Sequence, residues 1–537
     1  MMMHRSLCLL VLNAFVCCFI ATVNARAGAA GLDPGCAPQR PAVAHRQNGA
    51  MIETRQAAPI PCLVATGYPS AETRLTVTPR GTIVVMPAMK GTTAFPVRST
   101  NRGATWQLME NNLLQLDALD NDVIVDRDTG RVFEWDARFF KTRPSDAEAS
   151  RVVGYVLWSD DDGQMWTIGG ACSNCRKQNW HYWEYWRIFT GPAPAGGPKP
   201  IGYRNVLYVC GSNWHLRRCA RSLDGGKTIE VTTPLPKPPN TYVPPHPFEL
   251  DNDEWGQGCG TYGGEGVAGA DGTIYVAYEP CNTPYVAISR DEGMTWHAVQ
   301  ISSMLAVCVG PCAPGEYDFN EQPPGNPQLA IDRRGNLYAT FIGLYDGMVH
   351  LSISRDHGQT WSKPLNVTAP GVNRAVTSDV AVTPDGHLAV DYYGATNAPG
   401  APYGPEACSG NTFCPQYEHT TWNLYMTYTA DPLSKEPLFW SASLNDPRTP
   451  VYYKCPEGPI AGKECDGGVQ RGDLTGRIDY IGVAMGPDGM PWAGAAMACP
   501  QDGKSSAFCP KTRRGTYVGI VGHLLFRDTA LSALAGK

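Results

Sequence analysis

The octapeptide SRDHGQTW at residues 354–361 is one of five near-copies in the chain. The others are SRDEGMTW at 289–296, SDDDGQMW at 159–166, STNRGATW at 99–106 and SLDGGKTI at 222–229. The first serines of consecutive copies are 60, 63, 67 and 65 residues apart. A motif that returns at an almost fixed period indicates one structural unit used repeatedly.

The chemistry of the octapeptide is that of a hairpin turn. Its Asp or Asn side chain can accept hydrogen bonds from backbone N–H groups just ahead of it. Its Gly can adopt the positive φ that a Cβ disfavours. Its Thr begins the next strand, and its Trp covers apolar surface with an N–H that still finds a partner. The motif is thus explained without a substrate, and we predict that its carboxylates are structural.

A second pattern, two apolar strands joined by a glycine turn, gives the number of units. It is clearest at 75–85, weaker at 204–208, and returns around Gly130, Gly272, Gly335, Gly386 and Gly489. In four of the five units that carry both patterns, this turn precedes the first serine of the octapeptide by 17 to 19 residues. That distance leaves room for a third strand, and a fourth strand follows the Trp. The unit is therefore a four-stranded antiparallel sheet.

Seven such sheets arranged around an axis form a β-propeller. The sequence predicts an all-β fold with seven blades over residues 61–530. We expect the ring to close by pairing a strand near Val64 with the last sheet, near 517–525. Long insertions extend the loops and are candidates for a functional rim; they lie at 170–186, 233–262, 302–323, 394–422 and 446–473.

The N-terminal residues 1–25 have the features of a secretory signal peptide. Arg5 precedes an apolar stretch at 7–22, and Ala25 offers a small residue for cleavage. The alternative is an uncleaved signal anchor. Residues 26–60 are predicted to form a loose arm. The predicted signal contains one Arg and no acidic residue. Without it the chain has 43 Lys and Arg against 50 Asp and Glu, a net charge of −7. This charge argues against nucleic acid and anionic membrane surfaces as partners.

Cysteine usage agrees with export. Of 19 cysteines, three lie in the predicted signal, and the other sixteen fall into eight pairs of sequence neighbours. In an oxidising compartment such pairs predict local disulfides that staple long loops. The candidates are Cys36 with Cys62, Cys172 with Cys175, Cys210 with Cys219, Cys259 with Cys281, Cys308 with Cys312, Cys408 with Cys414, Cys455 with Cys465, and Cys499 with Cys509.

Two local motifs have other meanings. The C-x-x-C spacing at 172–175 also fits a redox or zinc half-site, although no second C-x-x-C accompanies it. Asn366 begins the sequon N-V-T and is a predicted glycosylation site.

The S-x-D-x-G-x-T-W turn resembles the Asp-box, or BNR repeat, of the sialidase-like superfamily. The resemblance covers about residues 70–525. It implies a propeller with the boxes on the outer rim, away from the catalytic face. Related propellers include sialidases, xyloglucanase-like hydrolases and non-enzymatic receptors, so the resemblance implies architecture more strongly than activity.

A sialidase would carry three arginines, a Tyr nucleophile with a Glu partner, and an Asp acid/base. The family's first arginine lies in a Y/F-R-I-P run at the start of the first blade, and Arg74 stands at that place here. The acid/base Asp should follow it, yet residues 75–98 contain neither Asp nor Glu. The family also usually has six blades. Both departures argue against an ordinary sialidase mechanism.

Ligand sites of propellers gather at the mouth of the central channel where the innermost strands begin. Polar residues near those strand starts include Asp120, Asp122, Asn326 and Gln328. The candidate catalytic residues, as paired acids or nucleophile of a glycosidase, are Glu265, Asp379, Asp479 and Tyr480. The candidate substrate-binding residues are Glu72, Arg74, Arg374 and Arg477. The alternative is that these side chains solvate a narrow channel and cap strand ends.

Two insertions suggest further roles. The aromatic run 181–187 would provide a surface on which a sugar ring stacks, or an apolar core beneath a long loop. The His and Tyr of 242–255 would suit proton abstraction by a polysaccharide lyase. Calcium at 120–122 or 251–253 is an alternative use of those acids, but neither spacing matches a complete calcium loop. We therefore expect no metal and no cofactor.

The first hypothesis for function is a secreted, carbohydrate-active propeller that cleaves glycosidic bonds at the channel mouth. The second is a non-catalytic propeller that binds a glycan or a protein through its loop-decorated face. A polysaccharide lyase is a further alternative. Whether the chain is an enzyme stays open at this point.

Overall fold

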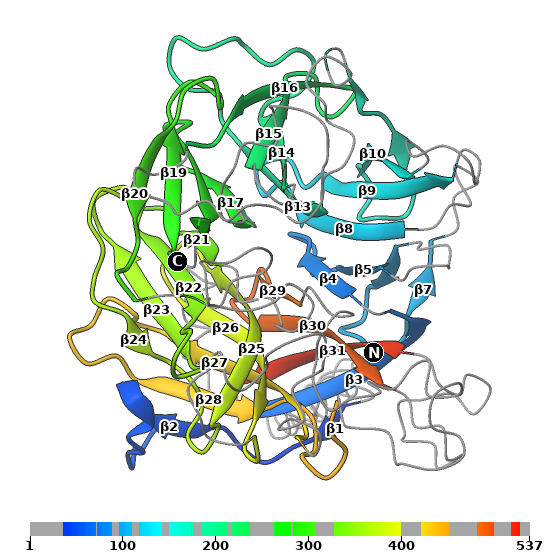
Figure 1. Ribbon diagram of the computed structural model, residues 1–537. Coiled ribbons are helices and arrows are strands. Elements are labelled where there is room, and N and C mark those ends of the chain that lie inside the picture. The colour runs from blue at the N-terminus through cyan, green and yellow to red at the C-terminus, as the bar shows by residue number, and fades with distance from the viewer. Residues whose placement is uncertain are drawn as a thin grey trace, which may run out of the picture.

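The computed structural model describes the chain in segments: residues 36–70, 72–88, 96–109, 118–141, 150–172, 174, 184–212, 217–236, 263–280, 283–304, 306, 327–398, 420–451, 481–498 and 517–526. In this part of the chain, seven sheets stand around a common axis, and one strand of each lies nearest the centre (Figure 1). The predicted seven-bladed propeller is confirmed.

The first four blades follow in chain order. Blade 1 contains β4 (Glu72–Val77), β5 (Ile83–Ala88), β6 (Val97–Ser99) and β7 (Gln107–Leu108). Blade 2 contains β8 (Ala118–Val125), β9 (Val132–Lys141), β10 (Ser150–Ser159) and β11 (Thr167–Ile168). Blade 3 contains β13 (Glu184–Gly191), β14 (Val206–Ser212), β15 (Arg217–Ser222), β16 (Thr228–Pro234) and, parallel to β16, β12 (Ala171–Cys172). Blade 4 contains β17 (Gly263–Ala268), β18 (Ile274–Tyr278), β19 (Tyr285–Ser289) and β20 (His297–Gln300).

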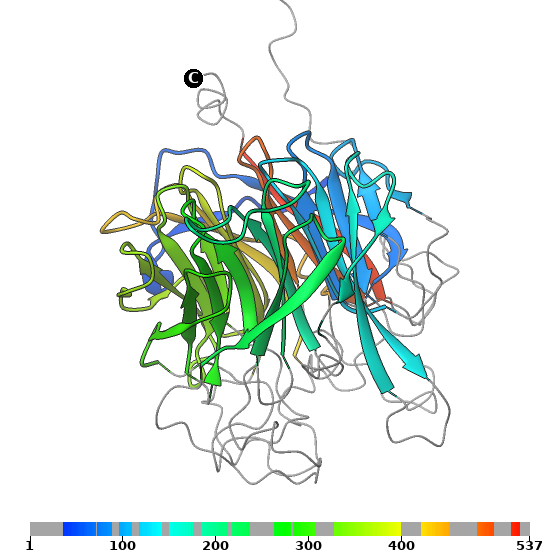
Figure 2. The same ribbon diagram turned by 90° about the horizontal axis from the view of Figure 1, so that it is seen from above.

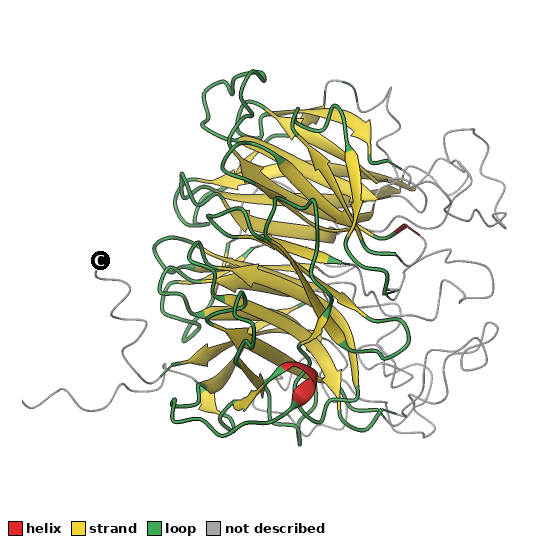
Figure 3. Cartoon of the chain, turned by 90° about the vertical axis from the view of Figure 1, so that its left-hand side faces the viewer, coloured by secondary structure: helices red, strands yellow, loops and turns green. Residues whose placement is uncertain are grey.

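The last three blades include strands from the N-terminal region. Blade 5 contains β21 (Gln328–Ile331), β22 (Leu337–Ile342), β23 (Val349–Ser354) and β24 (Leu365–Asn366). Blade 6 contains β25 (Arg374–Val382), β26 (Leu388–Ala395), β27 (Asn423–Thr429), β28 (Phe439–Ser443) and β2 (Val43–His45). Blade 7 contains β29 (Gly482–Met485), β30 (Pro491–Ala498), β31 (Tyr517–Leu525), β3 (Ile60–Pro69) and β1 (Ala37–Pro38). The short 3-10 helix η1 (Gln47–Gly49) follows β2 (Figure 3).

The strands run between two faces of the ring (Figure 2). Because neighbouring strands are antiparallel, the hairpins that follow the first and third strands of each blade lie at the same face. We call this the hairpin face, and it carries the five octapeptide turns. The inner strands end at the hairpin face and begin at the opposite face.

The core lies between successive blades. Every residue of β14 and of β22 is buried, because both faces of these strands pack against other side chains. Such strands have continuous apolar sequences rather than a strict polar alternation. Between blades 2 and 3, Trp135 packs against Trp186 with ring centroids 4.7 Å apart. Gly211, opposite Trp186, has no side chain to obstruct this ring.

The predicted hairpin chemistry of the octapeptides is present in detail. In blade 5, Ser354 Oγ accepts a hydrogen bond from Gly358 N at 2.8 Å and donates one to Asp356 Oδ1 at 2.8 Å. Asp356 in turn accepts from Thr360 N at 2.9 Å and from Thr360 Oγ1 at 2.6 Å. The residue before the Gly, His357, also has a positive φ of 59°. This second left-handed position was not predicted from the sequence; blade 3 fills it with glycine.

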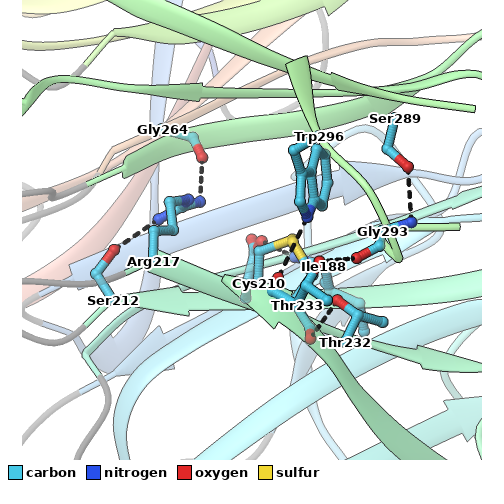
Figure 4. Close-up of a disulfide and its surroundings, with 12 residues drawn as sticks. Ile188, Cys210, Ser212, Arg217, Thr232, Thr233, Gly264, Ser289, Gly293 and Trp296 are labelled. Carbon is cyan, nitrogen blue, oxygen red and sulfur yellow. Dashed lines mark hydrogen bonds between the residues drawn. A yellow bond between two sulfur atoms is a disulfide. The ribbon is translucent and has the colours of Figure 1, made fainter. Parts of the chain in front are cut away.

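Each turn also contacts the preceding blade. The backbone of Gly103 in blade 1 approaches Val64 in blade 7, and that of Gly293 in blade 4 approaches Thr232 in blade 3. Figure 4 shows Ser289 bonded to Gly293 and Trp296 bonded to Thr233 of blade 3. A side chain at the glycine would meet the neighbouring sheet, so the octapeptides fix the spacing of blades. They do not line a shared cleft.

Asp356→Ala should therefore destabilise the protein by about 1 kcal/mol, the usual net value of a lost hydrogen bond. Asp356→Asn should be close to neutral, because Asn101 Oδ1 accepts the equivalent bond from Thr105 N at 2.9 Å in blade 1. Urea denaturation of the three proteins measures the difference. Equal losses for both variants would show that the carboxylate charge, and not the hydrogen bond, stabilises the turn.

The ring closes as predicted. The N-terminal strand β3 pairs with the C-terminal strand β31, with Val64 opposite Val521. The chain ahead of β3 is not a loose arm over its described part, which is a correction to the sequence-based expectation for residues 26–60. There, β1 adds to blade 7 and β2 adds to the edge of blade 6. His45 is buried, and its Nε2 lies 2.7 Å from Ser441 Oγ.

Two predicted disulfides are present within the described residues. Cys36 is bonded to Cys62, which ties the N-terminal segment to β3, and Cys210 is bonded to Cys219 across β14 and β15. Cys172 is also disulfide-bonded, whereas Cys175, its predicted partner, lies outside the described residues.

The other five predicted pairs stay predictions, because both members of each lie outside the described residues. These cysteines are Cys259 and Cys281, Cys308 and Cys312, Cys408 and Cys414, Cys455 and Cys465, and Cys499 and Cys509. The predicted signal peptide also lies outside the described part. Among the helices that the structure describes, none has the length and apolar character needed to span a bilayer.

Candidate functional site

Arg74 lies at the centre of the ring, on the inner strand of blade 1. Its Nε donates to Asp122 Oδ1 at 2.9 Å, and its Nη1 donates to Asp379 Oδ2 at 2.9 Å and to the carbonyl of Ile481 at 2.7 Å. Its Nη2 donates to Glu265 Oε1. Four of the five N–H donors of this guanidinium therefore bind acceptors from blades 2, 4, 6 and 7.

Arg187 on β13 adds a second cation. Its Nε lies 3.2 Å from Glu265 Oε1. We call Arg74, Arg187, Asp122, Glu265 and Asp379 the hub network. These side chains come from five blades and cross the channel at one level. Four of the five are buried, and Glu265 is partly buried, with 12% of its side chain exposed.

The two aspartates of the hub network are also held by backbone N–H groups. Asp122 accepts from Val123 N and Ile188 N, both at 3.0 Å. Asp379 accepts from Val380 N at 2.8 Å and Val483 N at 3.1 Å. These backbone donors fix the positions of both aspartate side chains as hydrogen-bond acceptors. Among the described residues, the Glu265 carboxyl contacts the guanidinium groups of Arg74 and Arg187.

Glu265 is positioned by the glycines around it. The pairing of β17 with β18 shifts its register between Gly263 and Gly266, which is a β-bulge. A Cβ at Gly264 would overlap Pro327 O, and one at Gly266 would overlap the ring of Phe189. Arg217 donates to Gly264 O at 2.6 Å and holds the bulged strand (Figure 4). The run G-G-E-G at 263–266 thus directs one carboxyl into the hub, a use of bulges often seen beside functional sites.

Burial changes the protonation of the hub carboxyls. It raises the pKa of Glu265 to about 7, while the charges of Arg74 and Arg187 oppose the change. Burial also raises the pKa of Asp379, again against Arg74 and Arg187. Burial alone would lower the pKa of Arg74, but its three carboxylates raise it well above the usual value.

A fourth carboxyl adjoins the network. Asp391 on β26 is directly opposite Asp379 on β25 and is fully buried. Burial and the charge of Asp379 raise its pKa well above the ordinary value. Four carboxyls thus lie close to two guanidinium groups, and of these carboxyls Glu265 has its pKa raised to about 7.

A cavity of about 700 Å³ extends from the hub network toward the hairpin face. Arg74, Glu265 and Asp379 line its inner end, and Arg127 and Arg333 lie among the residues at its outer end. The sequence-based expectation placed the working mouth where the inner strands begin. This cavity lies on the other side of the hub network, toward the ends of the inner strands. The loops beside the predicted mouth lie largely outside the described residues, so that expectation stays a prediction.

The structure brings together three of the eight predicted site residues: Arg74, Glu265 and Asp379. Arg374 is buried at the start of β25, where its side chain packs against Gly347, away from the hub network. Glu72 begins β4, but its side chain is outside the described part, as are Arg477, Asp479 and Tyr480. Asn366, the predicted glycosylation site, is half-buried on β24, and its Oδ1 accepts from Thr368 N.

Sequence reasoning missed Arg187 and Asp391 and did not select Asp122. The available signal was a charged residue inside an otherwise apolar strand, as in L-A-V-D-Y-Y at 388–393. Among the described residues, no group of three or more His, Cys, Asp and Glu side chains is arranged to hold a metal ion.

Comparison with known protein families identifies the octapeptide repeat. A family model described as "BNR/Asp-box repeat" matches residues 352–363. None of the curated proteins matches the chain. Similar solved structures include a protein of unknown function from Dyadobacter fermentans, with 13% identity, TM-score 0.41, and coverage of 92% of this chain and 100% of that one.

Two further structures carry functional names. The NanB sialidase of Streptococcus pneumoniae is 13% identical, with TM-score 0.37 and coverage of 89% of this chain and 70% of that one. The Aleuria aurantia lectin is 7% identical, with TM-score 0.38 and coverage of 68% and 94%. Because the sequence identities and TM-scores are this low, the fold is assigned from the matched repeat and from the seven blades of the ring. The chain is a seven-bladed β-propeller, and its segment 352–363 matches the BNR/Asp-box repeat.

Proposed function

We propose that the chain is a secreted carbohydrate-active enzyme that cleaves glycosidic bonds with carboxyl groups of the hub. The observation that carries this proposal is Glu265. Its carboxyl is turned into the central cavity by a glycine bulge, titrates near pH 7, and shares the Arg74 guanidinium with Asp379. A glycosidase needs two nearby carboxyl groups whose surroundings give them different protonation states.

In this mechanism Glu265 is the general acid. Its carboxyl donates a proton to the bridging oxygen as the bond from that oxygen to C1 breaks, and positive charge develops on the sugar ring. Asp379 is the second carboxylate. It either takes a proton from the water that adds to C1 or adds to C1 itself before water releases the sugar. Arg74 and Arg187 hold both carboxyls in place.

Arg74 has a different role here from the one its position in the sequence suggests. Its donors bind protein carboxylates, so it positions the reacting groups and does not serve as a substrate-binding arginine. A substrate carboxylate would have to displace one of three buried ion pairs. This arrangement supports hydrolysis of a neutral glycoside more than of a sialoside, in agreement with the lack of acid between residues 75 and 98.

Export is part of the proposal. Its support is the predicted signal at 1–25 together with the disulfides of the described part, which persist in oxidising compartments. A second candidate function is a non-catalytic propeller that binds glycans. The observation that favours it is the same pairing of Arg74, because a central arginine with four of its five N–H donors bound also suits a structural plug.

The test is a screen of the mature protein against sialosides, uronic-acid polymers and neutral glycans, in parallel with Glu265→Gln. Reducing ends report hydrolysis, and the ultraviolet absorbance of unsaturated uronates reports a lyase. Glu436→Gln, the same change at an exposed turn, is the matched control. Reducing ends that appear with the wild type and the control, and not with Glu265→Gln, support the proposal. Binding without cleavage of any substrate would favour the second candidate, and unsaturated products would favour the lyase.

A further inference from the structure

A second pocket lies on the outer rim of the ring, apart from the central cavity. It has a volume of about 600 Å³, shares no lining residue with the cavity at the hub, and is lined by Tyr68, Arg98, Trp106, Gln107, Leu108, Met109 and Gln164. We call it the rim pocket. Tyr68 comes from β3 of blade 7, five of the residues come from the outer part of blade 1, and Gln164 comes from the Asp-box of blade 2.

Arg98 is the charged residue that lines the rim pocket. Its Nη2 contacts Gln107 Oε1 at 3.4 Å and Gln164 Oε1 at 3.5 Å, and its Nη1 contacts the carbonyl of Asp162 at 3.4 Å. Its Nε is buried without a partner among the described residues. These distances are at the long end for hydrogen bonds, and all three acceptors are neutral.

The repeat provides an internal comparison. Arg221 of blade 3 also immediately precedes the first Ser of its Asp-box. Arg221 lies opposite Glu230 on the neighbouring strand, whereas Arg98 lies opposite Gln107. Arg221 Nη2 lies 3.0 Å from Glu230 Oε2, and its Nη1 binds Glu292 in the box of the next blade. Blade 3 therefore surrounds its arginine with two carboxylates.

Within the described residues, blade 1 lacks both of these contacts. The residue equivalent to Glu292 is Asp162, but its carboxylate binds Arg80 at 3.0 Å. Asp161 is close enough for its charge to interact with Arg98, yet it accepts hydrogen bonds from Ser159 and from the backbone of its own turn. Among the described residues, the Arg98 guanidinium thus has long hydrogen bonds to neutral acceptors and a carboxylate nearby that does not bind it, at the edge of an accessible pocket.

Two aromatic side chains accompany this charge, and both are half-buried. Trp106 Nε1 is buried without a partner among the described residues. The equivalent Trp166 Nε1 donates to Gly163 O at 2.9 Å, and Trp296 Nε1 donates to Thr233 O at 3.2 Å. The rim pocket thus combines aromatic surface, side-chain amides and an unsatisfied N–H, the composition of a site that holds a polar ring.

We propose that the rim pocket binds one anionic sugar ring, a pyranose that carries a carboxylate or a sulfate. The guanidinium of Arg98 pairs with the anionic group, which is the strong, geometrically specific contact available to arginine. The Trp106 and Tyr68 side chains contact the ring. This site is separate from the hub and does not depend on catalysis there.

The proposal is tested by titrating the mature full-length protein with three probes: methyl glucuronide, glucose 6-sulfate and methyl glucoside. Ligand-observed NMR gives the affinity. One or both of the anionic probes should bind at least about 10-fold more tightly than the neutral glucoside, and added salt should weaken that binding. The two anionic probes identify the source of the charge. Equal binding of all three would overturn the proposal.

Gln107→Glu is the decisive variant, because it rebuilds the arginine–glutamate pair of blade 3 without removing Arg98. It should reduce the affinity for the anionic probe at least about 10-fold. The reciprocal change in blade 3, Glu230→Gln, is the matched control and should leave the affinity unchanged. Thermal melting of both variants confirms that they fold. If Gln107→Glu binds the probe as the wild type does, Arg98 is not the anion site. Glu265→Gln should bind like the wild type, which separates this site from the hub.

Discussion

Replacing Arg74 by methionine lowers the free energy of unfolding by about 3 to 5 kcal/mol, the usual cost of removing one partner from a buried ion pair. The expected loss is large because three carboxylates, on Asp122, Glu265 and Asp379, share this one guanidinium. Without it, they remain buried with Arg187 as the nearby cation. Urea denaturation at pH 7, followed by tryptophan fluorescence, measures the change.

The control is Arg80→Met. The Arg80 side chain is 75% exposed and forms a surface ion pair with Asp162. Such pairs contribute about 1 kcal/mol or less. A double variant, Arg74→Met with Glu265→Gln, should recover part of the lost stability, because it removes one of the stranded charges. Equal stability of Arg74→Met and Arg80→Met would show that the hub carboxyls are neutral and do not need the arginine.

Replacing Glu265 by glutamine should reduce the rate of glycoside cleavage by about 10²- to 10⁴-fold, the usual contribution of a general acid. It should also change the pH dependence of stability. Because the pKa of Glu265 is raised to about 7 on folding from an ordinary value of 4.5, the folded state holds an additional proton between these values. Stability from this group is complete below pH 4.5 and is lost as the pH rises through 7.

The size of this effect follows from the shift. About 2.5 pH units at 1.36 kcal/mol each gives on the order of 3 kcal/mol between about pH 4 and pH 8. Buried Asp379 changes stability in the same direction, whereas the Asp-box aspartates, such as Asp356, have lowered pKa values and act in the opposite direction. The difference in free energy of unfolding between the wild type and Glu265→Gln, measured at each pH, isolates the contribution of the Glu265 carboxyl. A difference that does not vary with pH would mean that Glu265 is ionised throughout.

The fold was predictable because its signals are local. The side-chain hydrogen bonds of an Asp-box turn lie within its eight residues. Five copies of the motif therefore predict five turns, whatever the rest of the chain does. The pairing of Val64 with Val521 was predictable for a different reason. A ring of seven units has one position to close, and the apolar strand near Val64 was the one left without a partner.

The hub network was only partly predictable, because its contacts join distant parts of the chain. Arg74 meets Asp122, Glu265 and Asp379 across 48, 191 and 305 residues, respectively. The sequence indicated that polar residues would gather at the centre. It did not show that Arg74 would be surrounded by carboxylates rather than free to bind one, because that depends on how seven inner strands align along the axis. The contacts that fix blades 6 and 7 to residues 37–45 were missed because each involves few residues.

The closure of the ring has a consequence for synthesis. The β3 strand is synthesised well before its partner β31, because five complete blades and most of a sixth lie between them in the chain. During that interval β3 and β30, the two strands that pair with β31, each have an unpaired hydrogen-bonding edge, and the ring of blades is open. We expect nascent chains that stop short of residue 517 to associate with one another through these edges, so the synthesis of residues 517–525 determines whether the ring closes.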